Sequence, residues 1–313
     1  MRIVFIGTGE IGAPTLRALQ ESEHELVGVV TQPDKPAGRD QKIMPPPIKA
    51  ALAGKGMSIL QPARIKDRQA IDQIRELQPE AIVVMAYGQI LPRTVLEIPK
   101  IACVNLHASL LPRWRGAAPI QAAIAADDHE TGITAIYMDE GLDTGDILLQ
   151  RKVDILPSDT GGSVHDRLAQ LAPEALIESL RLLAGGNAPH IPQNNALATA
   201  APKLKREDGR INWEEPAEVI ERKVRAYNPW PGAFTKVWDG QHEQSLALKI
   251  LSAAVMPNID REPGEVIYAD DRGLVFATGK DALALLEVQL EGKRRMSGGE
   301  FVRGHRWIAR PLR

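Results

Sequence analysis

The chain has 313 residues, of which 44% are hydrophobic and 25% charged, and its formal net charge is -2 at pH 7. This length suits two domains, and the proportions of hydrophobic and charged residues are ordinary for a globular protein. No apolar run approaches the length needed to cross a bilayer. A strand-like run begins at Arg2, so we expect no targeting segment and a cytoplasmic location. The single cysteine, Cys103, excludes an intrachain disulfide and a cysteine-based zinc cluster. We expect it to be a small buried strand residue rather than a nucleophile.

Short β-branched runs alternate with helical patterns along the first half of the chain. A longer helical pattern follows and ends at Gly185-Gly186-Asn187, a typical stop signal. This alternation predicts an α/β domain with a doubly wound parallel sheet. The predicted strands are 3–6, 26–31, 58–60, 81–86, 101–104 and 133–138, and the predicted helices are 14–22, 48–53, 68–77, 117–126 and 164–183.

Residues 188–202 are rich in Pro, Asn, Gln, Ala and Thr without periodicity, which is typical of a linker. We therefore predict a first domain over 1–187, a linker over 188–204 and a second domain over 205–313. A helix over 217–225 and several short strands between turn residues predict a small β-barrel for the second domain. These strands are 233–238, 246–251, 264–269, 274–278 and 283–290.

Polar side chains follow the strand-like run 101–104. Asn105 and His107 lie two residues apart, so both leave the C-terminal end of the strand on one face, where open α/β sheets place their ligands. Asp143 lies in a tight Gly-Leu-Asp-Thr-Gly loop after the last predicted strand. An amide donor, an imidazole and a carboxylate are the groups that acyl transfer requires. The sequence favours equally that Asp143 orients His107 and that it caps a turn.

A second signal competes with this one. Gly7-Thr8-Gly9-Glu10-Ile11-Gly12 follows the first predicted strand and fits G-x-G-x-x-G, the fingerprint of dinucleotide binding. The acid that would hold a ribose hydroxyl is Asp34, which lies beyond the strand end, whereas ribose recognition requires it at the strand terminus. Glycine in a tight turn also has a structural explanation. We expect the match to be accidental, and an NAD(P) oxidoreductase stays open as an alternative.

Basic residues gather in three places although the total charge is nearly balanced. They lie in the loop 35–42, at 203–206 and in the tail 289–313. For any one patch a solvated surface is favoured, but three patches together favour a polyanionic partner.

The run Asn105 to Pro119, which reads NLHASLLPRWRGAAP, together with GLDTG at 141–145, resembles the folate-dependent formyltransferases. The resemblance implies a Rossmann-like N-terminal domain followed by an OB-like β-barrel, in agreement with the patterns above. One departure is Gly9, where the family often has proline, and this glycine helps to create the dinucleotide-like fingerprint. The resemblance continues through 31–39, 85–88, 91–92, 211–213 and 225–231, and so covers nearly the whole chain.

This resemblance implies an enzyme that transfers the formyl group of 10-formyltetrahydrofolate to the α-amino group of methionyl initiator tRNA, for the initiation of translation. Asn105 would donate to the oxyanion, and His107 would add a second donor or shuttle the proton. Asp143 would orient His107 or hold a water that relays the proton. The reaction requires no metal and no covalent intermediate, and we expect a monomer.

The resemblance also implies two sets of binding residues. For the leucines of the folate segment, simple core packing of the side chains is equally favoured. The tRNA residues would contact phosphates from the loop 34–49 and from the domain junction. The folate set is Ser109, Leu110, Leu111, Pro112, Leu91, Tyr87 and Gly88, and the tRNA set is Arg39, Lys42, Lys205 and Arg206.

Three alternatives stay open. A folate-dependent formyltransferase or hydrolase that acts on a nucleotide sugar or small amine would share the site but would not need the basic patches. The NAD(P) oxidoreductase would bind a dinucleotide and stay active after Asn105→Ala. An RNA-binding protein with an inactive enzyme domain is disfavoured, because Asn105, His107 and Asp143 are all present.

Overall fold

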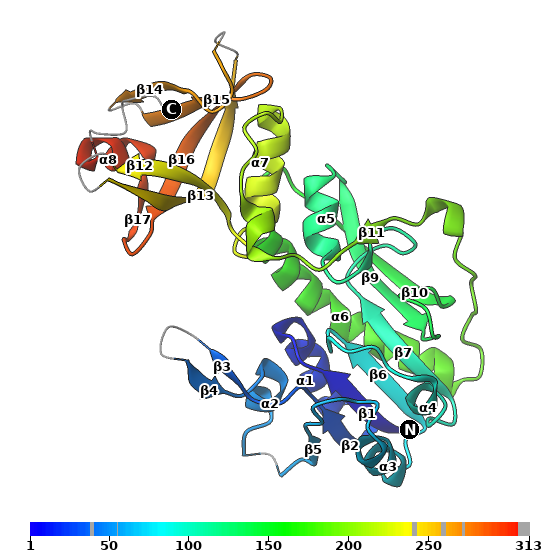
Figure 1. Cartoon of the computed structure of the whole chain (residues 1–313). Helices are drawn as coiled ribbons and strands as arrows, with labels where there is room; N and C mark the ends of the chain where they lie inside the picture. Colours follow the sequence, from blue (N-terminus) through cyan, green and yellow to red (C-terminus); the bar gives the residue numbers. More distant parts are fainter. Residues whose placement is uncertain (38–40, 55, 240–242, 258–260, 271–272, 306–313) are drawn as a thin grey trace. The chain divides into compact units, whose positions relative to one another are not determined.

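A seven-stranded sheet, in the order β10-β9-β7-β6-β1-β2-β5, forms the centre of the first part of the chain (Figure 1). The computed structural model describes residues 1–37, 41–54, 56–239, 243–257, 261–270 and 273–305. All six strands predicted in the first half lie in this sheet. The strands are β1 (Arg2–Gly7), β2 (Glu25–Val30), β5 (Ile59–Leu60), β6 (Ala81–Met85), β7 (Ala102–His107), β9 (Glu130–Tyr137) and β10 (Ile147–Asp154).

All of these strands except β9 run in the same direction. The strands β5, β2, β1, β6 and β7 pair in parallel, whereas β9 pairs antiparallel with β7, and β10 with β9. The predicted doubly wound sheet is confirmed as a mixed, mainly parallel sheet, in which β9 is reversed at this edge and β10 is a strand that the pattern did not predict. The connection between β7 and β9 contains the helix α5 (Pro119–Ala125).

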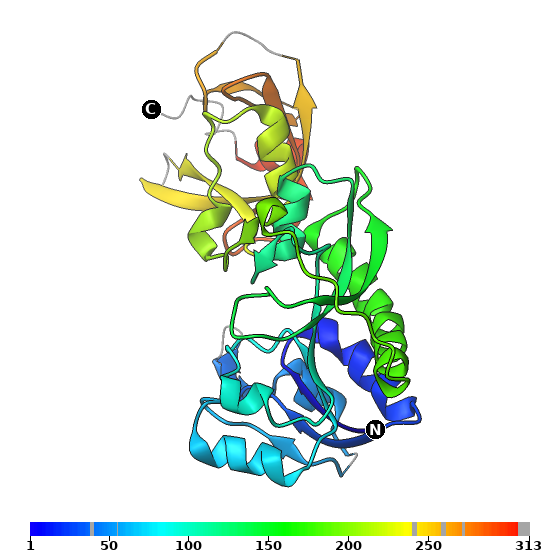
Figure 2. The ribbon, with the colours of Figure 1, turned by 90° about the vertical axis from the view of Figure 1, so that its right-hand side faces the viewer.

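Helices cover both faces of the sheet, which is the Rossmann-like arrangement expected (Figure 2). Ile74 of α3 and Val95 of α4 pack against Val4, Ile6 and Ile82 on one face. The helices α1 and α6 lie on the other face (Figure 2). All five helices predicted in the first half are confirmed, and α4 is an addition. The bounds are α1 (Ala13–Glu21), α2 (Pro47–Ala51), α3 (Arg68–Glu76), α4 (Arg93–Leu96) and α6 (Gly161–Ala184), with a 3-10 turn η1 (Glu10–Gly12) before α1.

Two short strand pairs lie outside the main sheet. The strands β3 (Lys35–Ala37) and β4 (Lys42–Met44) form an antiparallel hairpin within the predicted loop 34–49. The strand β8 (Arg115–Gly116) pairs in parallel with β11 (Ala200–Ala201). The segment 188–202, predicted as a linker, contains β11 and the 3-10 turn η2 (Asn195–Leu197). It is therefore attached to the motif 105–119 through this pairing.

The chain divides into two compact units. The first comprises Met1–Pro119, Glu130–Asp154 and His165–Pro202, and the second comprises Ile120–His129, Ile155–Val164 and Lys203–Arg313. Among the residues that the structure describes, no helix has the length and apolar character needed to cross a membrane.

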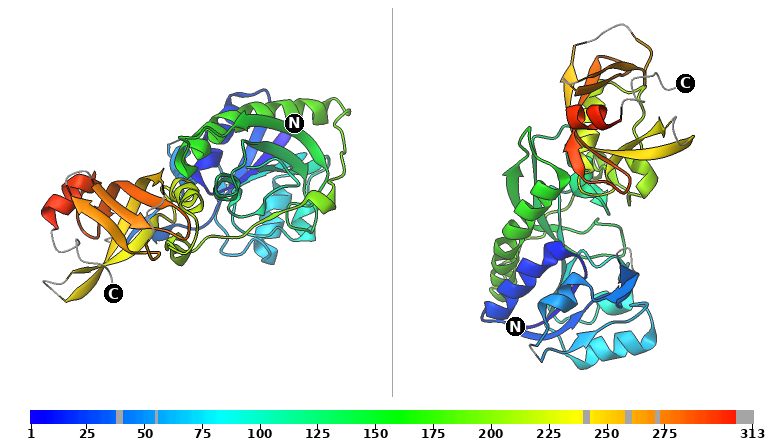
Figure 3. Two further views of the ribbon diagram at one scale, coloured as in Figure 1. Left: turned by 90° about the horizontal axis from the view of Figure 1, so that it is seen from above. Right: turned by 90° about the vertical axis from the view of Figure 1, so that its left-hand side faces the viewer.

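The second unit is built on an antiparallel sheet in the order β12-β13-β16-β15-β14, with β17 paired to β16 (Figure 3). The strand-rich antiparallel character predicted for this region is confirmed, and β17 and α8 are additions. The elements are η3 (Arg206–Gly209), α7 (Ala217–Ala226), β12 (Ala233–Asp239), β13 (Gln244–Met256), β14 (Val266–Asp270), β15 (Gly273–Ala277), β16 (Ala282–Leu290), β17 (Arg295–Ser297) and α8 (Gly298–Gly304).

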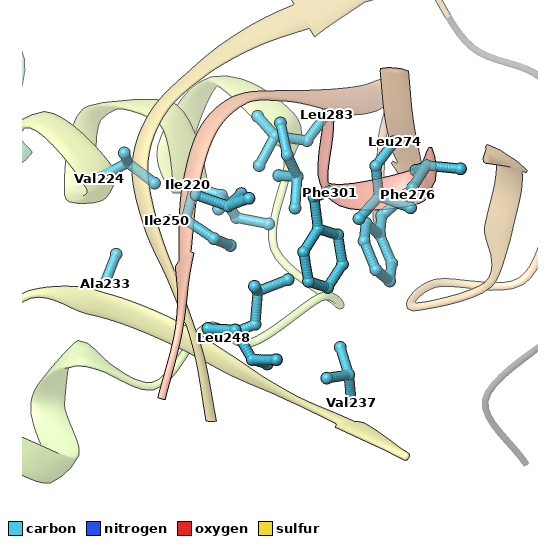
Figure 4. Packing of buried hydrophobic residues seen from close by; sticks show 14 of the residues in the cluster. Ile220, Val224, Ala233, Val237, Leu248, Ile250, Leu274, Phe276, Leu283 and Phe301 are labelled. Carbon is cyan, nitrogen blue, oxygen red and sulfur yellow. The ribbon is translucent and has the colours of Figure 1, made fainter. Parts of the chain in front are cut away.

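Two helices fill the inner face of this second sheet (Figure 4). Ile220 and Val224 lie four residues apart on α7, so both point to the same side of the helix. They share a buried cluster with Phe301 of α8 and with Phe276 and Leu283 of the sheet. Phe301, Phe276 and Leu283 are fully buried, so this core is specified by large apolar side chains from both helices and strands.

Close packing explains the glycines of the G-x-G-x-x-G segment. A Cβ atom on Gly7 would lie 2.6 Å from Phe5 Cε1 and 2.8 Å from Met85 O, and one on Gly12 would lie 3.3 Å from Phe5 Cζ. Gly9 and Gly12 have φ of -70° and -82°, so neither needs the left-handed region. Gly7 is therefore required by the contact of β1 with its neighbours, whatever the loop binds, and the positions of Gly9 and Gly12 are tightly packed.

Gly7→Ala is expected to destabilise the protein by about 1–3 kcal/mol, because the carbonyl of Met85 belongs to β6 and cannot move aside without disturbing the sheet. Gly9→Ala is the matched control, since its Cβ would meet only Ala86 Cβ, at 3.2 Å, and a small shift relieves that contact. Urea unfolding followed by circular dichroism measures both variants. Equal midpoints for Gly7→Ala and the native chain would contradict the packing argument.

Candidate active site

The strand β7 places Asn105 and His107 on one face of the sheet. Ala102, Cys103 and Val104 before them are buried, and the alternation of a strand then puts residues 105 and 107 on the same side. Asn105 is half-buried and His107 is buried. Because β9 runs antiparallel to β7, the loop after β9 begins beside Cys103, at Met138. This loop, residues 138–146, folds back over the sheet to reach the end of β7.

The carboxylate of Asp143, in this loop, has three neighbours. Its Oδ2 accepts from the backbone N–H of Gly116 at 2.9 Å and lies 3.6 Å from Nδ1 of His107. Its Oδ1 accepts from Nδ2 of Asn105 at 3.3 Å. The side chain of Asp143 is only 14% exposed. The structure therefore brings the three residues predicted as catalytic into one cluster and adds a backbone donor to it.

A different residue caps the turn in this loop. The carboxylate of Asp139 accepts from the N–H of Gly141 at 3.0 Å and from Oγ1 of Thr144 at 2.7 Å. Asp143 directs its carboxylate out of the loop, toward β7 and β8, and its backbone has φ of 54°, in the left-handed region that Asp tolerates better than most residues. Of the two roles that the sequence left open for Asp143, the geometry favours contact with His107 over turn capping.

The ring of His107 is fixed at its far nitrogen. Nε2 lies 2.9 Å from the carbonyl oxygen of Trp114, and because a carbonyl only accepts, Nε2 carries a hydrogen. Nδ1 then faces Asp143 Oδ2. In the charged form of the ring Nδ1 donates toward the carboxylate, whereas in this neutral tautomer its lone pair points at the carboxylate. The nitrogen of His107 that faces the cluster is therefore Nδ1, 3.6 Å from Asp143 Oδ2.

Glycines are required where the two halves of the site approach each other. A Cβ on Gly145 would overlap the carbonyl oxygen of Tyr137, and one on Gly141 would overlap Oγ1 of Thr144. Gly116 has φ of 121°, and a Cβ there would lie 2.5 Å from the carbonyl oxygen of Ala201. These positions need the close approach that only glycine permits.

The predicted folate segment is held by hydrogen bonds from β9 and β10. Oγ1 of Thr134 donates to the carbonyl of Ser109 at 2.6 Å and accepts from the N–H of Leu111 at 3.2 Å. Nε2 of Gln150 donates to the carbonyl of Leu111 at 2.9 Å. The peptide bond between Leu111 and Pro112 is cis. The shape of this segment is thus set by side chains of the antiparallel edge.

The side chains predicted to line the folate pocket divide between core and surface. Leu111, Leu91 and Tyr87 are each 3% exposed and pack in apolar clusters. Burial raises the pKa of Tyr87 to about 12, and its hydroxyl has no hydrogen-bond partner among the described residues. Leu110 is half-buried, and Gly88 is exposed with φ of 85°. The assignment of these residues to folate stays a prediction.

The predicted tRNA residues lie in different parts of the chain. Arg39 lies outside the described residues. Lys42 is exposed on β4, and Lys205 and Arg206 are exposed at the start of η3. Glu207 and Asp208 follow directly in the same turn, so the basic run at 203–206 is partly balanced by neighbouring acids.

The loop after β1 is occupied by internal hydrogen bonds. The N–H of Gly9 donates to the carbonyl of Ala86 at 3.2 Å, and Oγ1 of Thr8 donates to the carbonyl of Tyr87 at 3.1 Å. A dinucleotide would need such groups for its pyrophosphate. Gly9 and Thr8 of this segment therefore form hydrogen bonds that join the loop after β1 to the loop after β6.

Asp34, the acid of that fingerprint, is also occupied. Its Oδ1 accepts from Nε2 of Gln61 at 2.8 Å, and Nζ of Lys49 lies 2.8 Å from Oδ2. The hydrogen bond from Gln61 and that from Lys49 hold the pKa of Asp34 below its ordinary value of 3.8. This ion pair gives Asp34 a structural role in the loop before α2.

The sequence patterns assigned no role to three groups near the cluster. Gly116 contributes a backbone N–H, and a backbone donor leaves no signal in a sequence. Arg115 and Gln193 join each other through hydrogen bonds at 2.7 and 3.1 Å. Gln193 lies in the segment 188–202, which has no periodicity, so no pattern marks it. In the described residues no group of three or more His, Cys, Asp or Glu is arranged to hold a metal.

Comparison with known proteins defines the class. The formyl transferase family model matches residues 1–180, and the model of the formyl transferase C-terminal domain matches residues 203–306. The chain therefore belongs to the formyl transferase family, and the resemblance noted in the sequence is confirmed.

Individual relatives narrow the comparison. The methionyl-tRNA formyltransferase of Methylacidiphilum infernorum is 46% identical over 98% of this chain and 96% of its own length. Two solved structures share the fold. HypX from Aquifex aeolicus in complex with tetrahydrofolic acid has a TM-score of 0.63 at 18% identity, over 96% of this chain and 47% of that one. The methionyl-tRNA formyltransferase from Clostridium thermocellum has a TM-score of 0.57 at 22% identity, over 81% of this chain and 93% of that one.

Cys103 is expected to be unreactive in the folded protein. It is 6% exposed in β7, and burial raises the pKa of its thiol to about 12, so little thiolate forms at neutral pH. Because it is the only cysteine of the chain, Ellman's reagent reports on it alone. We expect no colour at pH 8 until guanidinium is added. Rapid reaction of the native chain would reopen the nucleophile reading.

The ion pair of Asp34 predicts a pH-dependent contribution to stability. Because the pKa of Asp34 is depressed in the folded protein, its contribution is complete above the ordinary value of 3.8 and is lost as the pH falls through the native pKa. Thermal unfolding of the native chain and of Asp34→Asn should be compared from about pH 6 to about pH 2.5. The native chain should unfold at a higher temperature near pH 6, and this difference should shrink toward pH 2.5. A difference independent of pH would contradict the assignment.

Proposed function

We propose that this chain transfers the formyl group of 10-formyltetrahydrofolate to the α-amino group of methionyl initiator tRNA, and so acts in the initiation of translation. The observation that carries the proposal is the Asp143 carboxylate between Asn105 and His107. The 46% identity over nearly the full length to a methionyl-tRNA formyltransferase supports this choice of substrate.

Asn105 is suited to stabilise the oxyanion. When the amine nitrogen attacks the formyl carbon, a C–N bond forms and negative charge develops on the formyl oxygen. The amide nitrogen of Asn105 has two hydrogens, and only one is directed at Asp143 Oδ1. The second is available for the formyl oxygen. A directed donor of this kind contributes on the order of 10² to 10³ in rate.

Asp143 and His107 are suited to move the proton. The attacking amine must lose a proton, and the folate nitrogen must gain one when its bond to the formyl carbon breaks. The carboxylate of Asp143 takes the first proton and returns one to the folate nitrogen, which balances the reaction. The Nδ1 of a charged His107 would stabilise the carboxylate before it takes the first proton and after it returns one. General acid-base catalysis contributes roughly 10² to 10⁴ in rate.

The binding residues of both substrates are part of the proposal. Ser109, Leu110, Leu111 and Pro112 follow β7 directly and so lead from the catalytic cluster, and Leu91, Tyr87 and Gly88 follow the neighbouring strand β6. We assign this group to the folate. Lys42, Lys205 and Arg206 have exposed side chains suited to phosphates, and we assign them, with Arg39, to the tRNA.

We further propose that the enzyme works as a monomer in the cytoplasm, where charged tRNA is used. The division into a catalytic domain over 1–187, a linker over 188–204 and a tRNA-binding domain over 205–313 is part of the same proposal. Support for the division comes from the family models, which match 1–180 and 203–306.

Formyl transfer to charged initiator tRNA tests the function. We expect the native chain to formylate methionyl initiator tRNA and not free methionine. Asp143→Asn should lower kcat by roughly 10² to 10⁴, because the proton acceptor is lost while the side-chain size is kept. His107→Ala should also lower kcat, since the carboxylate loses its partner at Nδ1.

Asp139→Asn is the matched control for Asp143→Asn. It makes the same chemical change in the same loop, but Asp139 caps the turn, and the amide oxygen of Asn can still accept from Gly141 and Thr144. We expect its kcat to stay within a few-fold of the native value. Native activity in Asp143→Asn would sink the site, and equal transfer to free methionine would sink the tRNA assignment.

A further inference from the structure

The side-chain amide of Gln193 bridges two carbonyls of the catalytic loop. Its Nε2 donates to the carbonyl of Asp143 at 2.9 Å and to that of Gly145 at 2.7 Å. An amide nitrogen has two hydrogens, so each carbonyl receives one. Gln193 therefore holds the backbone on both sides of Thr144, within the loop that presents the Asp143 carboxylate.

Arg115 fixes the orientation of this amide. The Oε1 of Gln193 accepts from Nε and Nη2 of Arg115 at 3.1 and 2.7 Å. In the flipped orientation the NH₂ group would face two donors of the guanidinium, and the oxygen would face two carbonyls. All four contacts would then be repulsive, so the orientation is determined by its partners. Nη2 of Arg115 also donates to Oδ1 of Asn195 at 2.8 Å, which ties it again to the segment 188–202.

The same two residues of β8 reach Asp143 by two routes. Gly116 donates its N–H to the carboxylate of Asp143 at 2.9 Å, and Arg115 reaches the main chain of Asp143 through Gln193. The pairing of β8 with β11 holds Arg115 and Gly116 in place. Asp143 is thus clamped at its side chain and at its backbone, which has φ of 54°, a conformation that an L-residue adopts at a cost.

We propose that Gln193, oriented by Arg115, is a positioning residue that holds the Asp143 carboxylate in its reactive place. This inference rests on the proposed function only for its kinetic consequence. Gln193 touches neither Asn105 nor His107 in the hydrogen bonds above, so it acts through Asp143. Gln193 is then a residue that supports the active site although it lies in the segment 188–202, which the composition indicates only as a linker.

Two substitutions of Gln193 separate positioning from simple attachment of the segment. Gln193→Met removes every hydrogen bond at similar length. Gln193→Glu keeps the contact with Arg115 but cannot donate to the carbonyls of Asp143 and Gly145. We expect both to lower kcat on the order of 10- to 100-fold, with KM for either substrate changed less than about twofold. Native kcat in Gln193→Glu would overturn the proposal, because attachment to Arg115 alone would then suffice.

A double-mutant cycle tests whether Gln193 acts through Asp143. In the Asp143→Asn background, Gln193→Met should lower kcat no further, since the group that it positions is already gone. Losses that multiply would overturn the proposal. Asn195→Ala is the control in the same segment, because it removes only one acceptor of Arg115, and its kcat should stay near the native value.

Amide hydrogen exchange supplies a readout that does not need activity. Release of Asp143 should speed the exchange of the Gly116 N–H, which donates to its carboxylate. The neighbouring N–H of Ala117 donates to the carbonyl of Ala201 and should be unchanged. Unchanged exchange at Gly116 in both Gln193 variants would refute the positioning role. Absence of formyl transfer in the native chain would refute the proposed function and leave this test intact.

Discussion

The hydrogen bond from the Gly116 N–H to the Asp143 carboxylate is the contact on which the site depends. It joins two loops that are far apart in the sequence, at 2.9 Å. Gly116 donates this bond from a backbone with φ of 121°, packed so closely against the carbonyl of Ala201 that a Cβ atom would not fit. The loop of Asp143 folds back over the sheet to accept it. A buried carboxylate without such donors would carry a desolvation cost of several kcal/mol. The backbone donor therefore offsets part of the cost of enclosing the Asp143 side chain, which is 14% exposed and has no arginine or lysine partner in the described hydrogen bonds.

The reversal of β9 decides where this carboxylate can lie. In a fully parallel sheet the loop after β9 would leave at the same edge as the end of β7, side by side with it. Because β9 is antiparallel, that loop begins beside Cys103 and must return over the face of the sheet. The carboxylate then approaches Asn105 and His107 from above the strand rather than from beyond its end. The same reversal places Thr134 and Gln150 where they hold the folate segment.

Periodicity predicted most of the fold, because burial of β-branched runs such as 81–86 leaves few alternatives to a central strand. It did not predict the reversal of β9, since β-branched residues pack equally well in a strand of either direction. The strand β10 was not predicted because Arg151 and Lys152, in its more exposed half, interrupt the apolar pattern. In the site, Asn105, His107 and Asp143 were predictable from spacing and resemblance. The partners that hold Asp143 were not, because the N–H of Gly116 is a backbone group and Gln193 lies in a segment without periodicity.

The position of the site also explains how a G-x-G-x-x-G segment can occur without a dinucleotide. In doubly wound sheets, ligands bind where neighbouring strands lead their loops to opposite sides, which here is between β1 and β6. At that point the loops are joined by the bond from Gly9 to Ala86 and by the bonds from Thr8 and Gln32 to the carbonyl of Tyr87. The glycines that would let a pyrophosphate approach instead let the loops of β1 and β6 approach each other. The polar side chains suited to chemistry lie one strand further along the sheet, at β7, where the antiparallel edge provides a second loop to face them.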